Sequence, residues 1–264
     1  VENKQYTIDD LFNYNEGWHS WQHHSRFSGV TAEDALQKIN TATQAAHDYI
    51  KTADCILITL GSAWIYTLTE KALNANVGTV AANNHKAPAD WFERKLMDVG
   101  QVITVLGTML DRLGALNPHI QVIFTISPVR HLREGVIDNN RSKAVLITAV
   151  HYMIEQLKKL YYFPAYELVI DDLRDYRFYA EDLVHPNYYA TQYVWEKFVQ
   201  ACMNDDTKKL MEEIASINLA FNHKPFNASS TMHQKFLANN YTKVKQLQEQ
   251  YSYLDFSKEL AYFS

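Results

Sequence analysis

The sequence predicts an α/β fold built on a parallel, doubly wound sheet. Three short apolar runs with strand character alternate with segments of helical periodicity between residues 31 and 203. Alternation of this kind is typical of strands that lie side by side in a parallel sheet, with helices packed on it. With 264 residues, of which 47% are hydrophobic and 21% charged, the chain is long enough for one large packed domain.

The first predicted pair of elements is a helix at 31–50 and a strand at 54–60. Thr31 is a suitable N-cap, and apolar residues then recur on one helical face: Ala35, Ile39, Ala42, Ala46 and Ile50. The run DCILITL follows and ends at Gly61. A short continuous apolar run is typical of a strand buried on both faces, so we expect Cys55 to be a buried thiol.

The second pair is a helix that begins near Ala89 and a strand at 120–126. Apolar residues separated alternately by four and three positions predict this helix, and Asn117-Pro118 ends it. The run IQVIFTI then predicts another buried strand.

The third pair is a helix at 141–160 and a strand around YYFPAYELVI, residues 161–170, whose limits Pro164 leaves open. A last helix is predicted at 190–203. The chain therefore divides into an α/β domain at 1–203 and a C-terminal helical extension at 204–264. In the extension, charged helical stretches flank the polar loop NHKPFNASSTMHQ.

Composition excludes several classes of protein. The net charge is −5 and there is no long basic block, so we expect no nucleic-acid partner. Two cysteines are too few for a disulfide framework. We see no apolar segment of bilayer length and no signal-peptide pattern in the first residues, so we expect no membrane association.

Polar residues that follow the predicted strands form the candidate site. Ligands bind outside the carboxyl ends of the strands in an open α/β sheet. The last of these loops, AEDLVHPN, holds Asp182 three residues before His185. With this spacing the carboxylate can bond to the imidazole Nδ1–H, which leaves Nε2 as a general base. The alternative is an ordinary structural loop.

Several segments together carry a family resemblance. The block DLVHPN resembles the last conserved block of SGNH (GDSL-type) hydrolases, and DCILITLGSAW resembles their third block. More specifically, the chain resembles the bacterial GSCFA-domain family, a branch related to these hydrolases, over residues 6–200. The matching segments are WHSWQHHSRFS, ITLGSAWIY, NNHKAP, FTISPVRHLREG and YFPAYELVIDDLRDYRFYAEDLVHP.

The resemblance implies a flavodoxin-like, three-layer fold and a serine esterase or acyl transferase. His185 would be the base and Asp182 its orienting carboxylate. The nucleophilic serine belongs to a Gly-Ser-Cys-Phe-Ala motif, which would precede Val1. The first two strands of the sheet order 2-1-3-4-5 would precede Val1 too. The strand 54–60 would then be a sheet edge, and we expect a retained N-terminal segment or a second copy of the chain, in a homodimer, to cover it.

The third-block loop departs from the SGNH pattern. Ala63 and Trp64 stand where the family has Asn and Asp, which removes a side-chain donor to the oxyanion. Gly61 and Ser62 remain as candidate oxyanion residues, and Ser62 is the alternative nucleophile within this chain.

Two residues of NNHKAP are further pocket candidates. Asn83 is a candidate replacement for the missing amide donor, and His85 lines the same pocket or has a structural role.

Five further residues are candidates to line the substrate site. Arg130 and His131 directly follow a strand, and the arginine could bind a carboxylate or phosphate, or pair with an acid of DDLRDY. The histidines of WHSWQHHSRFS, which are His19, His23 and His24, have three possible roles. They could line the substrate site, or they could pack structurally. They could also bind a metal, because His19 and His23 are four residues apart.

Three functions stay open. The first is ester hydrolysis or acyl transfer without a cofactor or metal, on an acyl or acetyl ester of a small molecule, a carbohydrate or a cell-wall component. The second is ligand or partner binding on a degenerate scaffold of the same kind. The third is a metal-dependent hydrolase built on the histidine cluster. By resemblance we expect a cytoplasmic bacterial protein.

Overall fold

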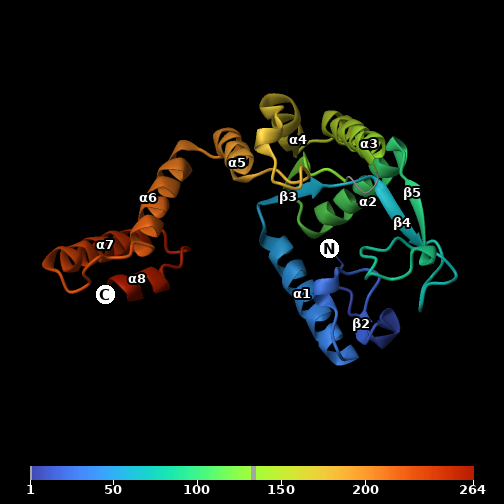
Figure 1. Cartoon of the computed structure of the whole chain (residues 1–264), viewed down its shortest axis with the longest axis horizontal. Helices are drawn as coiled ribbons and strands as arrows, with labels where there is room; N and C mark the ends of the chain where they lie inside the picture. The colour runs from blue at the N-terminus through green and yellow to red at the C-terminus, as the bar shows by residue number, and fades with distance from the viewer. Residues whose placement is uncertain (1, 132–134) are drawn as a thin grey trace. The chain divides into compact units, whose positions relative to one another are not determined.

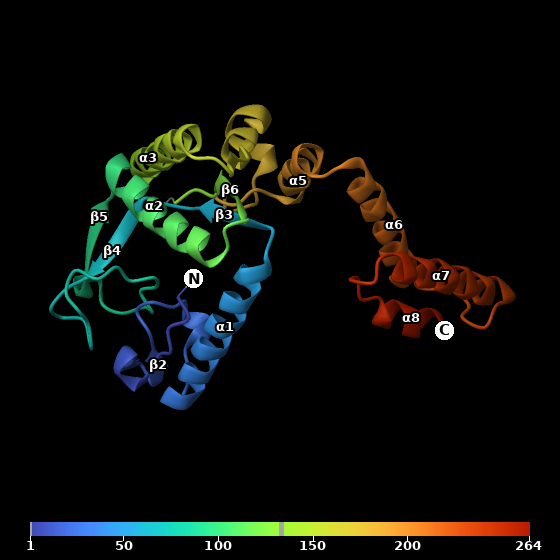
Figure 2. The ribbon, with the colours of Figure 1, turned by 180° about the vertical axis from the view of Figure 1, so that it is seen from behind.

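The computed structural model describes residues 2–131 and 135–264 (Figures 1 and 2). The chain divides into two compact units, Val1–Val194 and Trp195–Ser264. The first unit holds all of the described strands, and the second is helical.

A parallel sheet of three strands forms the centre of the first unit. Its strands are β3 (Cys55–Leu60), β6 (Gln121–Ile126) and β7 (Leu160–Tyr162), in the order β3-β6-β7. All three pair in parallel, with Ile56 opposite Val122 and Val122 opposite Leu160. The predicted mixed α/β class and parallel sheet are therefore confirmed.

One face of this sheet is covered by α2 (Val99–Leu116) and α3 (Gly135–Gln156), which pack together (Figure 2). Alternate strand residues point into this core because side chains alternate along a strand. They are Ile56, Ile58, Leu60, Val122, Phe124, Ile126 and Leu160.

The other face of the sheet is open along β3. Leu57 is 52% exposed there, and Cys55 is exposed, so the prediction of a strand buried on both faces with a buried thiol is wrong. The reason is the position of the strand. Within the described residues β3 pairs only with β6, so it is an edge strand of the described sheet.

The first predicted helix is confirmed as α1 (Ala32–Thr52). The Oγ1 atom of Thr31 accepts a hydrogen bond from the Asp34 N–H at 3.2 Å, which satisfies one free donor of the first turn. The buried face of α1 packs against the N-terminal segment, in a cluster made by Leu11, Ala32, Ala35 and Ile39.

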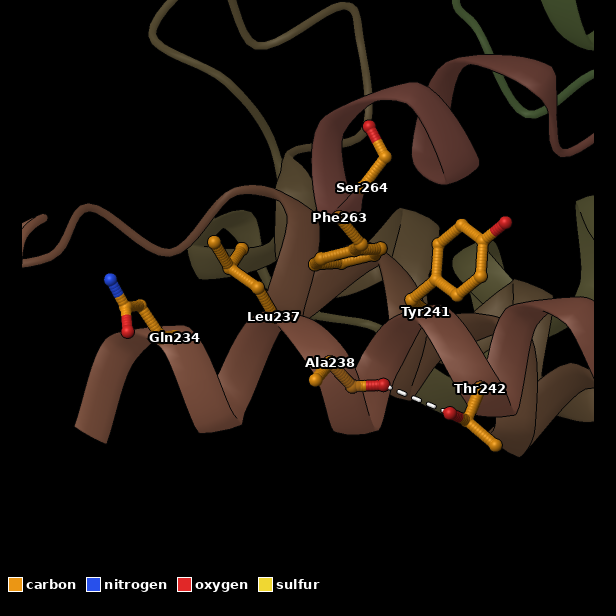
Figure 3. A pocket seen from close by; sticks show the side chains of 7 residues that line it. All are labelled: Gln234, Leu237, Ala238, Tyr241, Thr242, Phe263 and Ser264. Atoms are coloured by element: carbon orange, nitrogen blue, oxygen red, sulfur yellow. Dashed lines mark hydrogen bonds between the residues drawn. The ribbon is translucent and has the colours of Figure 1, made fainter. Parts of the chain in front are cut away.

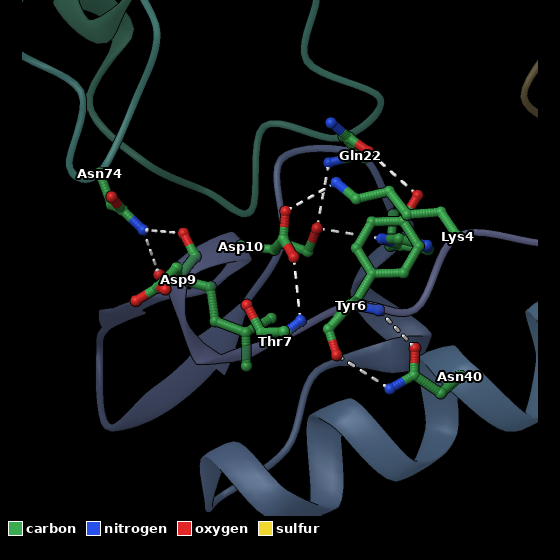
Figure 4. A network of polar contacts seen from close by, with 11 residues as sticks. Lys4, Tyr6, Thr7, Asp9, Asp10, Gln22, Asn40 and Asn74 are labelled. Carbon is green, nitrogen blue, oxygen red and sulfur yellow. Dashed lines mark hydrogen bonds and ion pairs between the residues drawn. The ribbon is translucent and has the colours of Figure 1, made fainter.

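Polar contacts also hold the N-terminal segment in place (Figure 4). The Tyr6 N–H donates to Asn40 Oδ1 at 2.8 Å, and the Asn40 side-chain amide donates back to Tyr6 O at 3.0 Å. Lys4 pairs with Asp10 at 2.7 Å. The backbone of the N-terminal segment is thereby bonded to the Asn40 side chain on α1.

The second helix begins later than predicted. Residues near 92 instead form β5 (Phe92–Leu96), which pairs antiparallel with β4 (Trp64–Leu68). α2 starts only at Val99, after a capping box in which Asp98 and Gln101 exchange hydrogen bonds. Phe92 and Leu96 fit a helical face by spacing, but the cross-strand partners of β5 lie 24 to 32 residues away in sequence.

The third strand is much shorter than predicted. β7 ends at Tyr162, before Pro164, and the chain then turns helical in α4 (Ala165–Glu167) and a π-helix (Leu168–Leu173). α3 also begins and ends earlier than the predicted 141–160. The last predicted helix is confirmed as α5 (Tyr188–Cys202).

A hairpin of β1 (Phe12–Tyr14) and β2 (Gly17–His19) adjoins an aromatic cluster. The buried members of this cluster are Phe12, Trp21, Leu68 and Ala72. Four short 3₁₀ helices complete the described elements of the first unit: Ile8–Asp10, Ser25–Phe27, Ala89–Trp91 and Tyr176–Phe178.

The second unit contains α6 (Asp205–Phe221), α7 (Thr231–Gln250) and α8 (Ser257–Phe263). Its core is built from Ile217, Val244, Leu247, Phe256 and Phe263. A cavity of about 590 Å³ opens between α7 and α8 (Figure 3). Its lining is mostly apolar, with Leu237, Tyr241 and Phe263 forming the walls.

One described helix, α2, is long and apolar enough to cross a membrane by length and composition alone. We did not expect a segment of that length from the sequence. Val102, Leu106 and Leu113 of this helix are buried in the core of the first unit. The packing of α2 against the sheet accounts for its apolar face.

Candidate active site

A tight loop between the 3₁₀ helix Tyr176–Phe178 and α5 holds the Asp–His pair. Tyr179 and Pro186 form a β-bridge at its base, and the Ala180 N–H donates to His185 O at 2.8 Å. Leu183, at the tip, has φ +55°. This left-handed turn returns the chain, so that residues three apart face each other.

Asp182 bonds to His185 through both of its carboxylate oxygens. Oδ2 lies 2.6 Å from His185 Nδ1, and Oδ1 accepts the backbone N–H groups of Val184 at 2.9 Å and His185 at 3.0 Å. The backbone bond from His185, followed by its side-chain bond, lowers the pKa of Asp182 to about 2. The ionised carboxylate keeps the proton on Nδ1, and Nε2 is left free to accept one.

The loop after β6 contacts the Asp–His loop directly. The Arg130 N–H donates to Val184 O at 3.3 Å, and its Nη1 donates to Leu183 O at 3.2 Å. The guanidinium also lies over the Tyr179 ring, with Cζ 4.1 Å from the centroid. Arg130 is therefore next to the Asp–His pair.

The third-block loop meets the same end of the sheet. A Cβ atom built on Gly61 would lie 3.6 Å from His131 Nε2, so the imidazole of His131 lies beside Gly61. The Ser62 hydroxyl lies 3.1 Å from the Ser142 hydroxyl and accepts the Trp64 N–H at 3.0 Å. Among the described residues Ser62 has no bond to a histidine, which weighs against its use as nucleophile.

The buried residue that the sequence analysis missed is Lys143. Its side chain is 1% exposed, and Nζ donates to Gly61 O at 2.6 Å and Ser127 O at 2.7 Å. Burial lowers the pKa of this amine to about 8. The sequence signal was its position on the apolar face of a helix, three residues before Leu146.

Family models identify the chain over nearly all of its length. One described as the GSCFA family matches residues 1–198. The chain belongs to the GSCFA family. A second model, described as the C-terminal domain of GSCFA domain proteins, matches residues 214–264. Searches of curated proteins and of solved structures found no match. The GSCFA resemblance drawn from the sequence is confirmed.

Two pocket candidates of this GSCFA chain lie in the aromatic cluster of the first unit. His85 is 8% exposed, contacts the rings of Phe12 and Trp21, and donates through Nε2 to Ser20 O at 2.9 Å. Asn83 Oδ1 accepts the His85 N–H at 2.8 Å. Burial lowers the pKa of His85, and its Nδ1 has no hydrogen-bond partner among the described residues.

The histidines of WHSWQHHSRFS lie around the same cluster. Their ring nitrogens have local partners: His19 bonds to Ser28 Oγ and Tyr14 O, His23 to Ser20 Oγ, and His24 to the Arg26 N–H. The described part of the chain brings no three His, Cys, Asp or Glu side chains together as a metal site.

The structure thus divides the candidates between two places. Within the described ranges, no hydrogen bond or ring contact joins the five residues of the aromatic cluster to the loops at the end of the sheet. The five are His19, His23, His24, Asn83 and His85. Gly61, Ser62, Arg130, His131, Asp182 and His185 belong to those loops.

Proposed function

We propose that this GSCFA chain carries the acid/base half of an SGNH-like ester hydrolase or acyl transferase. The observation that supports this function is the 2.6 Å contact between Asp182 Oδ2 and His185 Nδ1. His185 is 61% exposed, so a substrate can reach its ring. A histidine with an ionised carboxylate on one ring nitrogen and an accessible second nitrogen is suited to general-base catalysis.

The sheet supports the same proposal. The order β3-β6-β7 agrees with strands 3-4-5 of a flavodoxin-like sheet. The loop after β6 bonds to the Asp–His loop, and Lys143 joins the start of the loop after β6 to the end of β3. In the proposed doubly wound fold, one further strand pairs with the free edge of β3, and a second strand pairs with that one. Ligands of such folds bind at this end of the strands.

The proposed reaction begins with a serine from the family's Gly-Ser-Cys-Phe-Ala motif. His185 Nε2 accepts the hydroxyl proton as the serine oxygen attacks the ester carbonyl, and a tetrahedral oxyanion forms. The intermediate expels the alcohol, which receives the proton from His185. Water or an acceptor alcohol then takes the acyl group from the serine by the same two proton transfers. By resemblance, the substrate is an acyl or acetyl ester, on a carbohydrate or cell-wall component.

The test is hydrolysis of p-nitrophenyl acetate by the full gene product and by its His185→Ala variant. Removal of the base should lower kcat/KM by a factor of about 10³. His119→Ala, at an exposed position, is the control and should leave the rate unchanged. If wild type and His185→Ala are equally slow, the proposed catalysis is wrong.

A non-catalytic binding protein is the second candidate, and the third-block loop favours it. Ala63 has no polar side chain, and its N–H is already bonded to Ser142 Oγ at 2.7 Å. The indole N–H of Trp64 is bonded to Asp138 O at 3.2 Å. A scaffold of this kind would bind its ligand without turnover. An inert gene product that still binds an ester tightly would support this alternative.

A further inference from the structure

A pocket of about 380 Å³ opens beside the Asp–His loop. Leu183, which lies between Asp182 and His185 in sequence, forms part of its wall. Among the described residues that line it, Arg130 is the one with a charged side chain. The others are Pro128, Val136, Asn139, Asn140, Tyr166, Ile170 and Tyr176.

Arg130 has no acidic partner among the described residues. The sequence had suggested an ion pair with an acid of DDLRDY, but these acids bond elsewhere: Asp171 to Arg174, Asp172 to the Tyr193 hydroxyl and Asp175 to Arg177. The guanidinium instead donates to Leu183 O and lies 4.1 Å and 5.3 Å from the ring centroids of Tyr179 and Tyr176.

This geometry leaves most of the guanidinium donors available. A guanidinium has five N–H groups in a planar fork, and one of them donates to Leu183 O. The aromatic rings hold the fork at the pocket wall. A carboxylate or phosphate can therefore bond to two N–H groups at once.

We propose that this pocket binds an oxyanion, a carboxylate or phosphate, carried by the substrate. This inference rests on the proposed function, because it places the anion next to His185. The substrate class is then an ester with a carboxylate or phosphate a few bonds from the scissile carbonyl. The Tyr166, Ile170 and Tyr176 side chains provide an apolar wall for the part of the molecule that carries the anion.

The first test measures binding and does not depend on turnover. This chain is titrated with succinate and, separately, with inorganic phosphate, by isothermal calorimetry. We expect saturable binding of at least one, which Arg130→Gln weakens by about tenfold or more because a charge-assisted pair is lost. Arg130→Lys should recover part of the affinity, since it keeps the charge without the fork.

Arg177→Gln is the matched control, because Arg177 is an exposed arginine of the same region outside the pocket. It should bind both anions like the wild type. Thermal unfolding of each variant shows whether it is folded. The inference is overturned if the wild type shows no saturable binding, or if folded Arg130→Gln binds both anions as tightly as the wild type.

The second test compares two esters in the full gene product, p-nitrophenyl acetate and mono-p-nitrophenyl succinate. The ratio of kcat/KM for the anionic ester to that for the neutral ester should fall about tenfold in Arg130→Gln. An unchanged ratio contradicts the proposed substrate class. If neither ester reacts but binding still depends on Arg130, the proposed function fails and the anion pocket stands.

Discussion

The Nζ atom of Lys143 lies 2.6 Å from the carbonyl oxygen of Gly61, and this contact joins α3 to the end of β3. The same atom bonds to Ser127 O at 2.7 Å, just after β6. A neutral amine has two N–H donors, and these two carbonyls accept both. A third proton would have no acceptor among the described residues. Burial therefore lowers the pKa of Lys143 to about 8.

The first prediction concerns stability in alkali. Between pH 8 and about 10.4, the ordinary pKa of lysine, the unfolded chain holds a proton on Lys143 that the folded chain has lost. The free energy of unfolding contributed by Lys143 must then rise with pH through this window. Lys143→Met should remove that rise. Urea unfolding at pH 7.5 and pH 9.5 measures it.

Lys158→Met, at an exposed position on the same unit, controls for the loss of one charge. Its change in stability between the two pH values should match that of the wild type. If Lys143→Met also matches the wild type, Lys143 is not held as a neutral amine.

The second prediction concerns stability in mild acid. Burial lowers the pKa of His85, so the unfolded chain binds a proton more readily than the folded chain as pH falls below about 6.5. The contribution of His85 to stability is present above this pH and is lost on acidification. His85→Gln keeps a donor for Ser20 O and does not titrate. Its Tm should fall less than that of the wild type between pH 7 and pH 5.

His24→Gln replaces an exposed histidine of the same region and should show the full wild-type decrease. A His85→Gln profile that parallels the wild type would mean that the buried imidazole does not govern acid sensitivity.

The third prediction concerns the orienting carboxylate. Asp182, with a pKa of about 2, is ionised at all working pH values. Asp182→Asn should therefore lower kcat/KM for p-nitrophenyl acetate at every pH from 5 to 9, by a factor of order 10³–10⁴, because the amide no longer selects the Nδ1–H tautomer. Circular dichroism checks the fold. A loss confined to low pH would contradict the role given to Asp182.

The fourth prediction concerns the free edge of β3. We propose that a further segment of the family's domain or a second copy of the chain covers it, since Leu57 is 52% exposed and one edge of its strand has no partner among the described residues. This chain alone should self-associate at concentrations of order 100 µM, and Leu57→Lys should reduce the association because it places a charge on the edge. Sedimentation velocity measures both. A monomeric wild type at that concentration rules out the second copy as the cover.

The features that the sequence determined are local. The Asp182–His185 contact joins residues three apart in sequence, and so does the hydrogen bond from the Asp34 N–H to Thr31 Oγ1. Both bonds therefore depend on a few neighbouring backbone torsions. The strands β3 and β6 and the helix α1 followed from runs and periodicities within single segments, whereas only the first two residues of the predicted third strand are in β7. The GSCFA resemblance was likewise drawn from short motifs along the chain, and the family model matches residues 1–198.

The tertiary structure decided which segments meet. β5 is a strand because Phe92–Leu96 pairs with Trp64–Leu68, although its own spacing also suited a helix. The buried Lys143 donates hydrogen bonds to carbonyl groups that lie 82 and 16 residues away in sequence. Arg130 borders a pocket because the Asp–His loop packs beside it. Burial, pKa and free hydrogen-bond donors depend on such distant neighbours, and a pattern within one segment carries no information about them.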